Sequence, residues 1–358
     1  MDALDLVEAE FTCTDGRWKG SIVALHEVPL DATWPERFGA LARAGAAEWF
    51  ECERDWSRWC AAQIAQCTDP QQFDVIAFSG QTIFHQPANG YTAQLGSGAE
   101  LYAAFGARVP VVSDLRSLDV ALGGQGAPLV PVADALLFSG YEACLNLGGF
   151  SNISLERDGR RLAWDVGPCN LVLNALAQRQ GLPFDSSGQL AASGDVLPEL
   201  FADWMNLPYH NEMAPKSLGV EWLQQSFWPV LAQHEHNGAL VTEDLLATAV
   251  AYIAAQVRSA AKGRKTLVTG GGAFNEELVR HFGEASPISE GDVPFEAIVP
   301  DATLVQGKEA FAFGFLGLLR WLEWDNVWPE VTGSSMAHMG GALWGKNGLS
   351  SPSPNAMQ

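Results

Sequence analysis

Short apolar runs that end in glycine turns, separated by longer helical stretches, are the feature that most limits how this chain can fold. Buried strands are expected at 73–78, 109–113 and 143–148, because these runs are short, apolar and bounded by turn residues. Such alternation predicts an α/β fold with largely parallel or mixed sheets flanked by helices. The expected helices lie at 35–67, 171–180, 218–228, 242–261, 275–283 and 309–324.

Part of this pattern occurs twice. Residues 143–166 form a strand ending in two glycines, a second strand, an Asp-Gly-Arg turn and a third strand. Residues 4–28 reproduce the second and third strands as a hairpin around Asp15-Gly16-Arg17. Together with a length of 358 residues, the repeat predicts two similar domains. The first copy begins without the strand that opens the second, so we expect the first domain to lack its first strand.

The domain boundaries follow from the repeat and from composition. We expect a first domain at 1–140 and a second at 141–345, whose last helix packs back between the domains. The stretch 346–358 is rich in Ser, Pro, Gly and Asn and reads as a loose tail.

Charge excludes several classes of partner. The chain has 21 basic and 42 acidic residues, a net charge of −21, which repels nucleic acid and anionic lipid. Its acidic N-terminus lacks the features of a signal peptide, and no apolar run reaches the roughly 18 residues that span a bilayer. The six cysteines form no Cys-x-x-Cys pair and are expected to be reduced. We expect a cytoplasmic protein with no membrane or nucleic-acid partner.

The densest group of polar residues lies between 80 and 131. Polar side chains between short apolar strands lack partners in a core, so they favour a site for a polyhydroxylated small molecule. An arginine there could bind a carboxylate in a bidentate way. The glycine-rich part of this stretch could equally be an ordinary turn. The polar residues are Gln81, Thr82, Asp114, Arg116, Asp119 and Gln125.

Asp165 ends an apolar strand just before a helix begins, which is where α/β proteins often place reactive groups. It could act as a general base that takes a proton from water or a hydroxyl. Alternatively, its carboxylate could cap the helix expected at 171–180. In the same way, Ser217, next to Lys216, could cap the helix at 218–228.

Two glycine turns could bring backbone amides close to an anion. One is Gly148-Gly149, and the other is Gly270–Gly272 before Asn275. Neither matches a Walker A or dinucleotide motif. Two such turns at equivalent strand ends suit a nucleotide site, with one turn at the phosphates and the other at the nucleoside. Glu309 opens an apolar helix and could face either a ligand or solvent.

Several strings, in this order along 80–335, resemble one family closely: the anhydro-N-acetylmuramic acid kinases of the actin/hexokinase-like superfamily. They are GQTIFHQP, QLGSGAEL, SDLRSLDVALGGQGAPLVP, LNLGGFSNIS, DVGPCN, PKSLG, TGGGAFN, KEAFAFGFLG and VTGSS. The resemblance implies two RNase H-like domains with a ligand cleft between them, and usually a homodimer. It also implies that ATP and water convert 1,6-anhydro-N-acetylmuramic acid to N-acetylmuramic acid 6-phosphate in cell-wall recycling, with Mg²⁺ assisting.

The resemblance also assigns residues. Asp165 matches the family's catalytic base, and the positions that match its sugar site are Gln81, Thr82, Arg116 and Glu309. The positions that match the nucleotide site are Asp2, Asp5, Gly148, Gly149, Asn152, Gly270, Gly271, Gly272 and Asn275.

Some positions depart from the family pattern. The family's N-terminal phosphate loop resembles G-T-S-x-D-G-x-D, and only its last residues have a counterpart here, with Ala3 in place of a glycine. Val166 and Cys169 stand where Thr and Gly are usual. Two alternatives therefore remain beside an active kinase: a sugar-binding or regulatory relative that has lost phosphoryl transfer, and a kinase of a related anhydro- or amino-sugar.

Overall fold

The computed structural model describes residues 3–214, 216–238, 240–284 and 293–348. The chain forms two compact units, the first made of Met1–Leu137 with Gly307–Gln358 and the second of Phe138–Gln306. The predicted boundary at 140 lies close to the first break. The stretch from Gly307 onward, however, joins the first unit rather than the second. Its helix α13 (Ala302–Trp321) explains this, because Phe315 and Leu319 of α13 pack in one cluster with Val112.

The second unit is built on a five-stranded mixed sheet with the order β11-β10-β7-β8-β9. β10 runs parallel to both β7 and β11, whereas β7, β8 and β9 form antiparallel pairs. The strands are β7 (Ala143–Leu147), β8 (Phe150–Arg157), β9 (Arg160–Pro168), β10 (Thr266–Thr269) and β11 (Ala297–Ile298). The helices are α6 (Asn170–Ala177), α7 (Gln189–Ser193), α8 (Pro198–Met205), α9 (Val220–Trp222), α10 (Trp228–Asn237), α11 (Thr242–Ala261) and α12 (Glu276–Phe282).

Helix α11 is the centre of the second unit's hydrophobic core. It contacts α6, α7, α8, α12 and β9, and its side chains from Leu245 to Val257 are almost all buried. An aromatic group adds to this core: Trp204 stacks on Phe227 with ring centroids 4.5 Å apart, and both lie near Tyr252. The helix predicted at 218–228 is irregular here, because a π-helical turn at Leu223–Phe227 separates α9 from α10.

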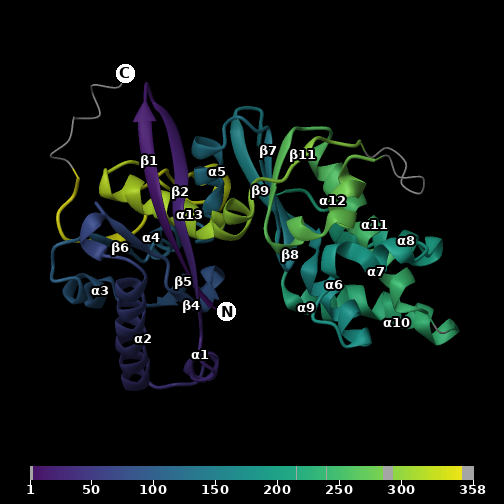
Figure 1. Cartoon of the computed structure of the whole chain (residues 1–358), viewed down its shortest axis with the longest axis horizontal. Coiled ribbons are helices and arrows are strands. Elements are labelled where there is room, and N and C mark those ends of the chain that lie inside the picture. The colour runs from purple at the N-terminus through teal and green to yellow at the C-terminus, as the bar shows by residue number, and fades with distance from the viewer. Residues whose placement is uncertain (1–2, 215, 239, 285–292, 349–358) are drawn as a thin grey trace. The chain divides into compact units, whose positions relative to one another are not determined.

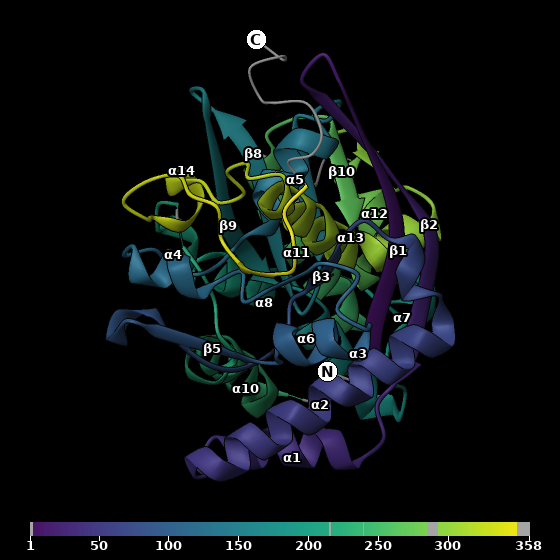
Figure 2. The same cartoon turned by 90° about the vertical axis from the view of Figure 1, so that its left-hand side faces the viewer.

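The first unit holds its strands in separate sheets. β1 (Ala3–Thr14) and β2 (Arg17–Pro29) form a long antiparallel hairpin whose strands run side by side for its whole length (Figure 1, Figure 2). Three further strands form a sheet of order β12-β6-β3, and two form the hairpin β4-β5. These strands are β3 (Ile76–Phe78), β4 (Gln81–Gln86), β5 (Tyr91–Leu95), β6 (Val111–Ser113) and β12 (Ala342–Trp344).

The helix predicted over 35–67 is wrong as a single helix. It is divided into α1 (Thr33–Leu41) and α2 (Ala46–Cys67), because Gly45 is extended, with φ −76° and ψ 166°. The Gly45 N–H donates to the Glu48 carboxylate at 2.9 Å, which starts α2 with a side-chain cap. The other helices of this unit are α3 (Gly98–Ala104), α4 (Ser117–Ala121), α5 (Val130–Leu137) and α14 (Pro329–Thr332).

The strand pairings of the two units can be compared. In the second unit, β7 joins the parallel pair β10-β11 to the antiparallel pair β8-β9. The first unit has an equivalent parallel pair, β3-β6, and an equivalent antiparallel pair, β1-β2.

The core of the second unit makes a stability prediction. Trp204 is fully buried, so Trp204→Ala should lower the free energy of unfolding by about 3–5 kcal/mol through lost burial and a cavity. Phe184→Ala in the same unit is the control, because Phe184 is 56% exposed and should cost little. Chemical denaturation measures both free energies of unfolding, with circular dichroism as the signal because tryptophan fluorescence would change with the substitution itself. Equal losses in the two variants would contradict this account of the core.

Candidate active site

A row of polar side chains crosses the sheet of the second unit. Asn152 on β8 pairs with Asn146 on β7 and with Asp165 on β9, and Asn146 also pairs with Thr269 on β10. Paired residues project from the same face of a sheet, with neighbouring Cβ atoms about 5 Å apart. The register shifts by one residue between Ser151 and Asn152, a bulge of the kind that redirects side chains near active sites. The row therefore brings Asp165 and Asn152, two predicted site residues, together.

The Asp165 carboxylate is held on one side only. Its Oδ2 accepts a hydrogen bond from the Leu218 N–H at 2.8 Å, while Oδ1 has no hydrogen-bond partner within the described ranges. Burial raises the pKa of Asp165, and the Leu218 hydrogen bond opposes that rise only in part. A half-satisfied carboxylate with a raised pKa is suited to accept a proton from a ligand or water.

The alternative that Asp165 caps a helix is excluded. α6 begins at Asn170, its N-cap residue is Cys169, and no side chain caps it. Asp165 itself lies within β9. The alternative for Ser217 fails in the same way, because α9 begins at Val220 with Gly219 as its N-cap residue.

A loop from the 3₁₀ turn at Pro208–Asn211 to Leu218 fixes the backbone of Asp165. The Tyr209 hydroxyl donates to the Asp165 carbonyl at 2.7 Å, and the Asp165 N–H donates to the Lys216 carbonyl at 3.0 Å. Lys216 Nζ donates to the Tyr209 carbonyl at 2.7 Å and lies 4.2 Å from the Tyr209 ring centroid. Burial, with the nearby Asp165 charge, raises the pKa of Tyr209, so its hydroxyl remains a donor. These contacts hold the backbone of Asp165 from a segment that lies outside the sheet.

The two glycine turns lie together at the ends of β7 and β10. Gly270 has φ 82°, and a Cβ there would lie 2.5 Å from Asn146 Oδ1 and 2.9 Å from the backbone of Leu147. A Cβ on Gly272 would lie 2.7 Å from the Leu147 side chain. Only glycine fits this approach. Because β7 and β10 are parallel, both turns emerge at their carboxyl ends, where open α/β sheets bind ligands.

The start of α6 packs on the first glycine turn. The Cys169 N–H donates to the Gly149 carbonyl at 2.9 Å, and the Asn170 N–H donates to the Gly148 carbonyl at 3.1 Å. The Asn170 side-chain amide donates to the Leu147 carbonyl at 2.9 Å. Asn170 thus links this helix to the strand end beside the glycine turns.

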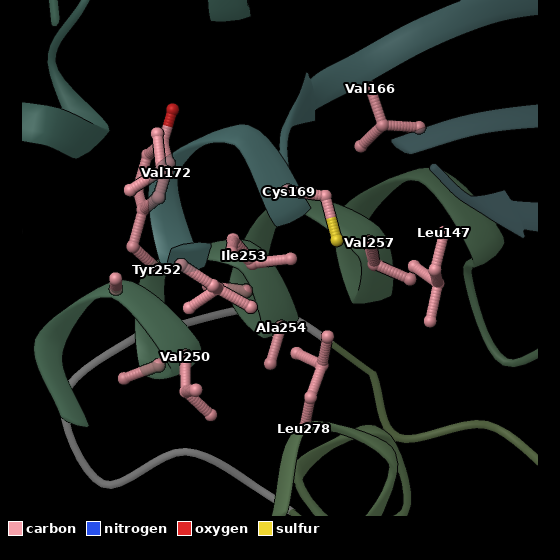
Figure 3. Close-up of a cluster of buried hydrophobic side chains, with 14 of the residues drawn as sticks. Leu147, Val166, Cys169, Val172, Val250, Tyr252, Ile253, Ala254, Val257 and Leu278 are labelled. Carbon is pink, nitrogen blue, oxygen red and sulfur yellow. The ribbon is translucent and has the colours of Figure 1, made fainter. Parts of the chain in front are cut away.

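The departures at Val166 and Cys169 are packing positions. Both side chains are buried in the core, and the sulfur of Cys169 points toward Val257 of α11 (Figure 3). Complete burial raises the pKa of Cys169 to about 12, so its thiol is neutral and unreactive at physiological pH. Neither residue carries chemistry at the polar row. Among the described residues, no two cysteines form a disulfide.

Asn275 has a structural partner. Its side-chain oxygen accepts from the Leu278 N–H at 2.9 Å and so caps α12. It is 8% exposed, which leaves little of it for a ligand.

In the first unit, Gln81 and Thr82 lie at the base of the β4-β5 hairpin. Gln94 is opposite Thr82 on β5, and its side-chain nitrogen donates to Thr92 Oγ1 at 2.8 Å. Gln81 Oε1 and Gln94 Oε1 are both buried and have no hydrogen-bond partner among the described residues. A buried acceptor without a donor is unfavourable, so these two amides suit a ligand that brings hydroxyl or amide donors.

Arg116 is the cation of the first unit's site. Its Nη1 donates to the Gly126 carbonyl at 2.7 Å, and its guanidinium carbon lies 5.4 Å from the Phe313 ring centroid. Burial lowers the pKa of Arg116, and the charge of Glu309 opposes this. Arg116 and Glu309, predicted from separate motifs, therefore interact.

Asp5 lies near the same glutamate. Burial raises the pKa of Asp5, and the negative charges of Glu27 and Glu309 raise it further. Bringing a cation to this carboxylate would relieve the repulsion. Asp2 lies outside the described residues.

One predicted ligand-lining residue, Asp119, is corrected. Asp119 is completely buried and bonded within the fold, so it does not face a ligand. Asp114 is exposed, and its carboxylate accepts a hydrogen bond from the Ser117 hydroxyl at 2.6 Å.

Asn146, Asn170 and Gln94 were not singled out by the sequence analysis. Asn146 carried a usable signal, because it alternates with the apolar Leu145 and Leu147 and thus points away from the core. Gln94 and Asn170 lie inside motifs, but their partners are remote in sequence and no local pattern reveals them.

Comparisons with known proteins agree with the motif resemblance. The family model described as "Anhydro-N-acetylmuramic acid kinase" matches residues 1–346. A relative of that name from Methylobacterium nodulans is 37% identical over 290 residues, covering 76% of this chain and 72% of that protein. Another from Paramagnetospirillum magneticum is 35% identical over 357 residues, covering 95% and 96%. One from Pseudomonas fluorescens is 33% identical over 347 residues, covering 90% and 92%.

The environment of Asp165 predicts a gain in stability on neutralising it. Because its pKa is higher in the folded than in the unfolded chain, ionisation disfavours the folded state. This cost is full above the folded pKa and vanishes below the unfolded value of about 3.9. Asp165→Asn should therefore raise Tm at pH 7, with a difference that shrinks toward pH 4. Differential scanning calorimetry measures Tm. A lower Tm of the variant at pH 7 would contradict the claim that burial raises the pKa of Asp165.

Proposed function

This chain belongs to the anhydro-N-acetylmuramic acid kinase family, and we propose that it catalyses the reaction that the name describes. The substrate is 1,6-anhydro-N-acetylmuramic acid, whose anhydro bond is hydrolysed while O6 is phosphorylated by ATP. The product is N-acetylmuramic acid 6-phosphate, an intermediate of cell-wall recycling. The observation that carries the proposal is Asp165, a half-satisfied carboxylate on a polar row beside two glycine turns.

Asp165 is the general base of this proposal. Its free Oδ1 takes a proton from a water molecule whose oxygen attacks the anomeric carbon C1. The C1–O6 bond breaks, and the electron pair stays on O6. O6 bonds to the γ-phosphorus of ATP, and the bond to the β–γ bridging oxygen breaks to release ADP. The Leu218 N–H holds Oδ2 and so keeps Oδ1 directed to the ligand side.

The first unit supplies groups for the sugar. Arg116 is proposed to bind the lactyl carboxylate, since a guanidinium matches a carboxylate with two parallel hydrogen bonds. Gln81, Thr82 and Gln94 would accept and donate hydrogen bonds to hydroxyl and acetamido groups, and Glu309 would accept from a hydroxyl. The unpartnered acceptors at Gln81 and Gln94 support this role.

The second unit supplies groups for ATP. Gly148, Gly149 and Asn152 are proposed to face the phosphates, and Gly270–Gly272 the adenosine. The close approach of the Gly270 backbone to Asn146 and Leu147 supports a site where side chains are excluded. Asn275 would act here through its cap on α12, beside the same turn.

The described residues could hold a magnesium ion only if phosphate oxygens complete its coordination shell. The described residues contain no group of three or more His, Cys, Asp or Glu that could hold a metal. Mg²⁺ characteristically binds one or two carboxylates and completes its shell with water and phosphate oxygens. Asp5, whose pKa is raised by burial and by neighbouring carboxylates, is the carboxylate we propose for it. When bound, Mg²⁺ would neutralise charge on the transferring phosphoryl group.

The cellular setting is part of the same proposal. We propose a cytoplasmic homodimer, on the strength of family membership. In the described part of the chain, no helix combines the length and the apolar character that crossing a membrane requires.

The general base makes the first functional prediction. Asp165→Asn should lower kcat by at least about 100-fold, while leaving sugar binding intact. A coupled assay of ADP release and calorimetric sugar titration measure the two. Asp203→Asn in the same unit is the control, because Asp203 is an exposed partner of His234. Undiminished turnover by the Asp165 variant would remove it from the mechanism, and a wild-type protein that leaves the anhydro-sugar unchanged would overturn the proposed function.

A second functional prediction concerns the glycine turn at Gly270–Gly272. Gly270→Ala places a Cβ against Asn146 and Leu147 at a positive φ, so it should weaken ATP binding by about tenfold or more. Gly140→Ala is the matched control, since a Cβ there meets nothing within 4 Å. Calorimetric titration with a non-hydrolysable ATP analogue measures both. Equal affinities in the two variants would contradict the assignment of this turn to the nucleotide.

A further inference from the structure

The guanidinium of Arg116 is held by a chain of contacts that begins in the C-terminal segment of the same unit. Arg116 Nη1 donates to the Gly126 carbonyl at 2.7 Å. The N–H of Gly126 in turn donates to Asp119 Oδ2 at 2.6 Å. The position of Arg116 therefore depends on the loop 123–127, and that loop depends on Asp119.

Asp119 is tied to the C-terminal segment through its other oxygen. Asp119 Oδ1 accepts from the Thr332 hydroxyl at 2.6 Å and contacts His338 Nε2 at 3.1 Å. Asp119 has no exposed surface, and Thr332 is 2% exposed. A carboxylate so deeply buried is stable only while donors satisfy it, so losing one donor disturbs the rest.

The loop wraps closely around this carboxylate. A Cβ on Gly124 would lie 2.2 Å from Asp119 Oδ2, and one on Gly126 would lie 2.8 Å from Val120. The Gln125 N–H donates to the Thr332 carbonyl at 2.8 Å. The fit leaves the loop little freedom to adjust if the Asp119 carboxylate moves.

We propose that Asp119 and Thr332 are positioning residues, which set the guanidinium of Arg116 for the carboxylate of the substrate. This inference rests on the proposed function, because that function gives Arg116 its ligand. It assigns a role to the VTGSS motif at 331–335, which forms no part of the mechanism above. Residues 331–335 would thus complete the sugar site without touching the sugar.

Thr332→Val tests the proposal, because it keeps the shape of the side chain and removes only the hydroxyl. KM for the anhydro-sugar should rise about tenfold with a smaller change in kcat, since the arginine is displaced and the base is not. Thr332→Ser keeps the hydroxyl and should restore KM. Thr248→Val is the matched control: Thr248 is also fully buried and donates a hydrogen bond at 2.6 Å, but it lies in the other unit. It should lower Tm and leave KM unchanged.

A double-mutant cycle separates positioning from general loss of structure. If Thr332 acts through Arg116, Thr332→Val should have no further effect on KM in an Arg116→Ala background. An unchanged KM in the single variant, or the same tenfold rise in both backgrounds, would overturn the proposal.

A readout that needs no turnover keeps this test distinct from that of the proposed function. Slowed rotation of the Arg116 guanidinium, followed by ¹⁵N NMR, should be lost in Thr332→Val and retained in Thr332→Ser. If the wild-type protein fails to act on the anhydro-sugar, the proposed function fails. The guanidinium signal then decides the positioning role alone: its persistence in Thr332→Val would overturn that role.

Discussion

The register of the β7-β8-β9 ladder is the constraint on which the rest of the site depends. Leu145 and Leu147 on β7 belong to the core around α11, so the residue between them, Asn146, must face the other way. Pairing then carries this polar position across to Asn152 and Asp165. A slip of one residue would bury Asn146 and expose leucines, which fixes the register strongly. Hydrophobic burial on one face thus places the Asp165 carboxylate on the other.

Asp119 and Asp165 show that the hydrogen-bond donors around a buried carboxylate decide its role. Asp119 has donors on both oxygens and is sealed from solvent, so it organises the loop around it. Asp165 has a donor on one oxygen, and burial raises its pKa. The first arrangement stabilises structure, whereas the second leaves an acceptor for a proton. In the proposed function, the same burial that costs stability at Asp165 suits it to act as a base.

Much of this follows from the sequence. Periodicity predicts the α/β class, and the Asp-Gly turns predict both hairpins, because these signals are local. Sequence patterns also predict Asp165 and the glycine turns as site residues of the second unit, although β9 continues past Asp165 to Pro168. The motif resemblance is confirmed by a family match over residues 1–346.

The rest depends on contacts that sequence spacing does not encode. Asp119 resembled a ligand-binding residue because its partners Thr332 and His338 are more than 200 residues away. The break before α2 depends on a single glycine whose N–H bonds to Glu48. α13 joins the first unit because its aromatic face packs there, a choice that its own amphipathic pattern leaves open. In each of these cases the local sequence allows more than one structure, and tertiary packing decides between them.

The most direct test of the account is to run the reaction in ¹⁸O-labelled water and locate the label in the product. A base at Asp165 that activates water for attack on the sugar places ¹⁸O on C1, detectable by its isotope shift in ¹³C NMR immediately after turnover. The phosphate on O6 should then contain no solvent oxygen. Label in released inorganic phosphate and none at C1 would mean that water attacks phosphorus instead of the sugar, and the assignment of Asp165 would be contradicted.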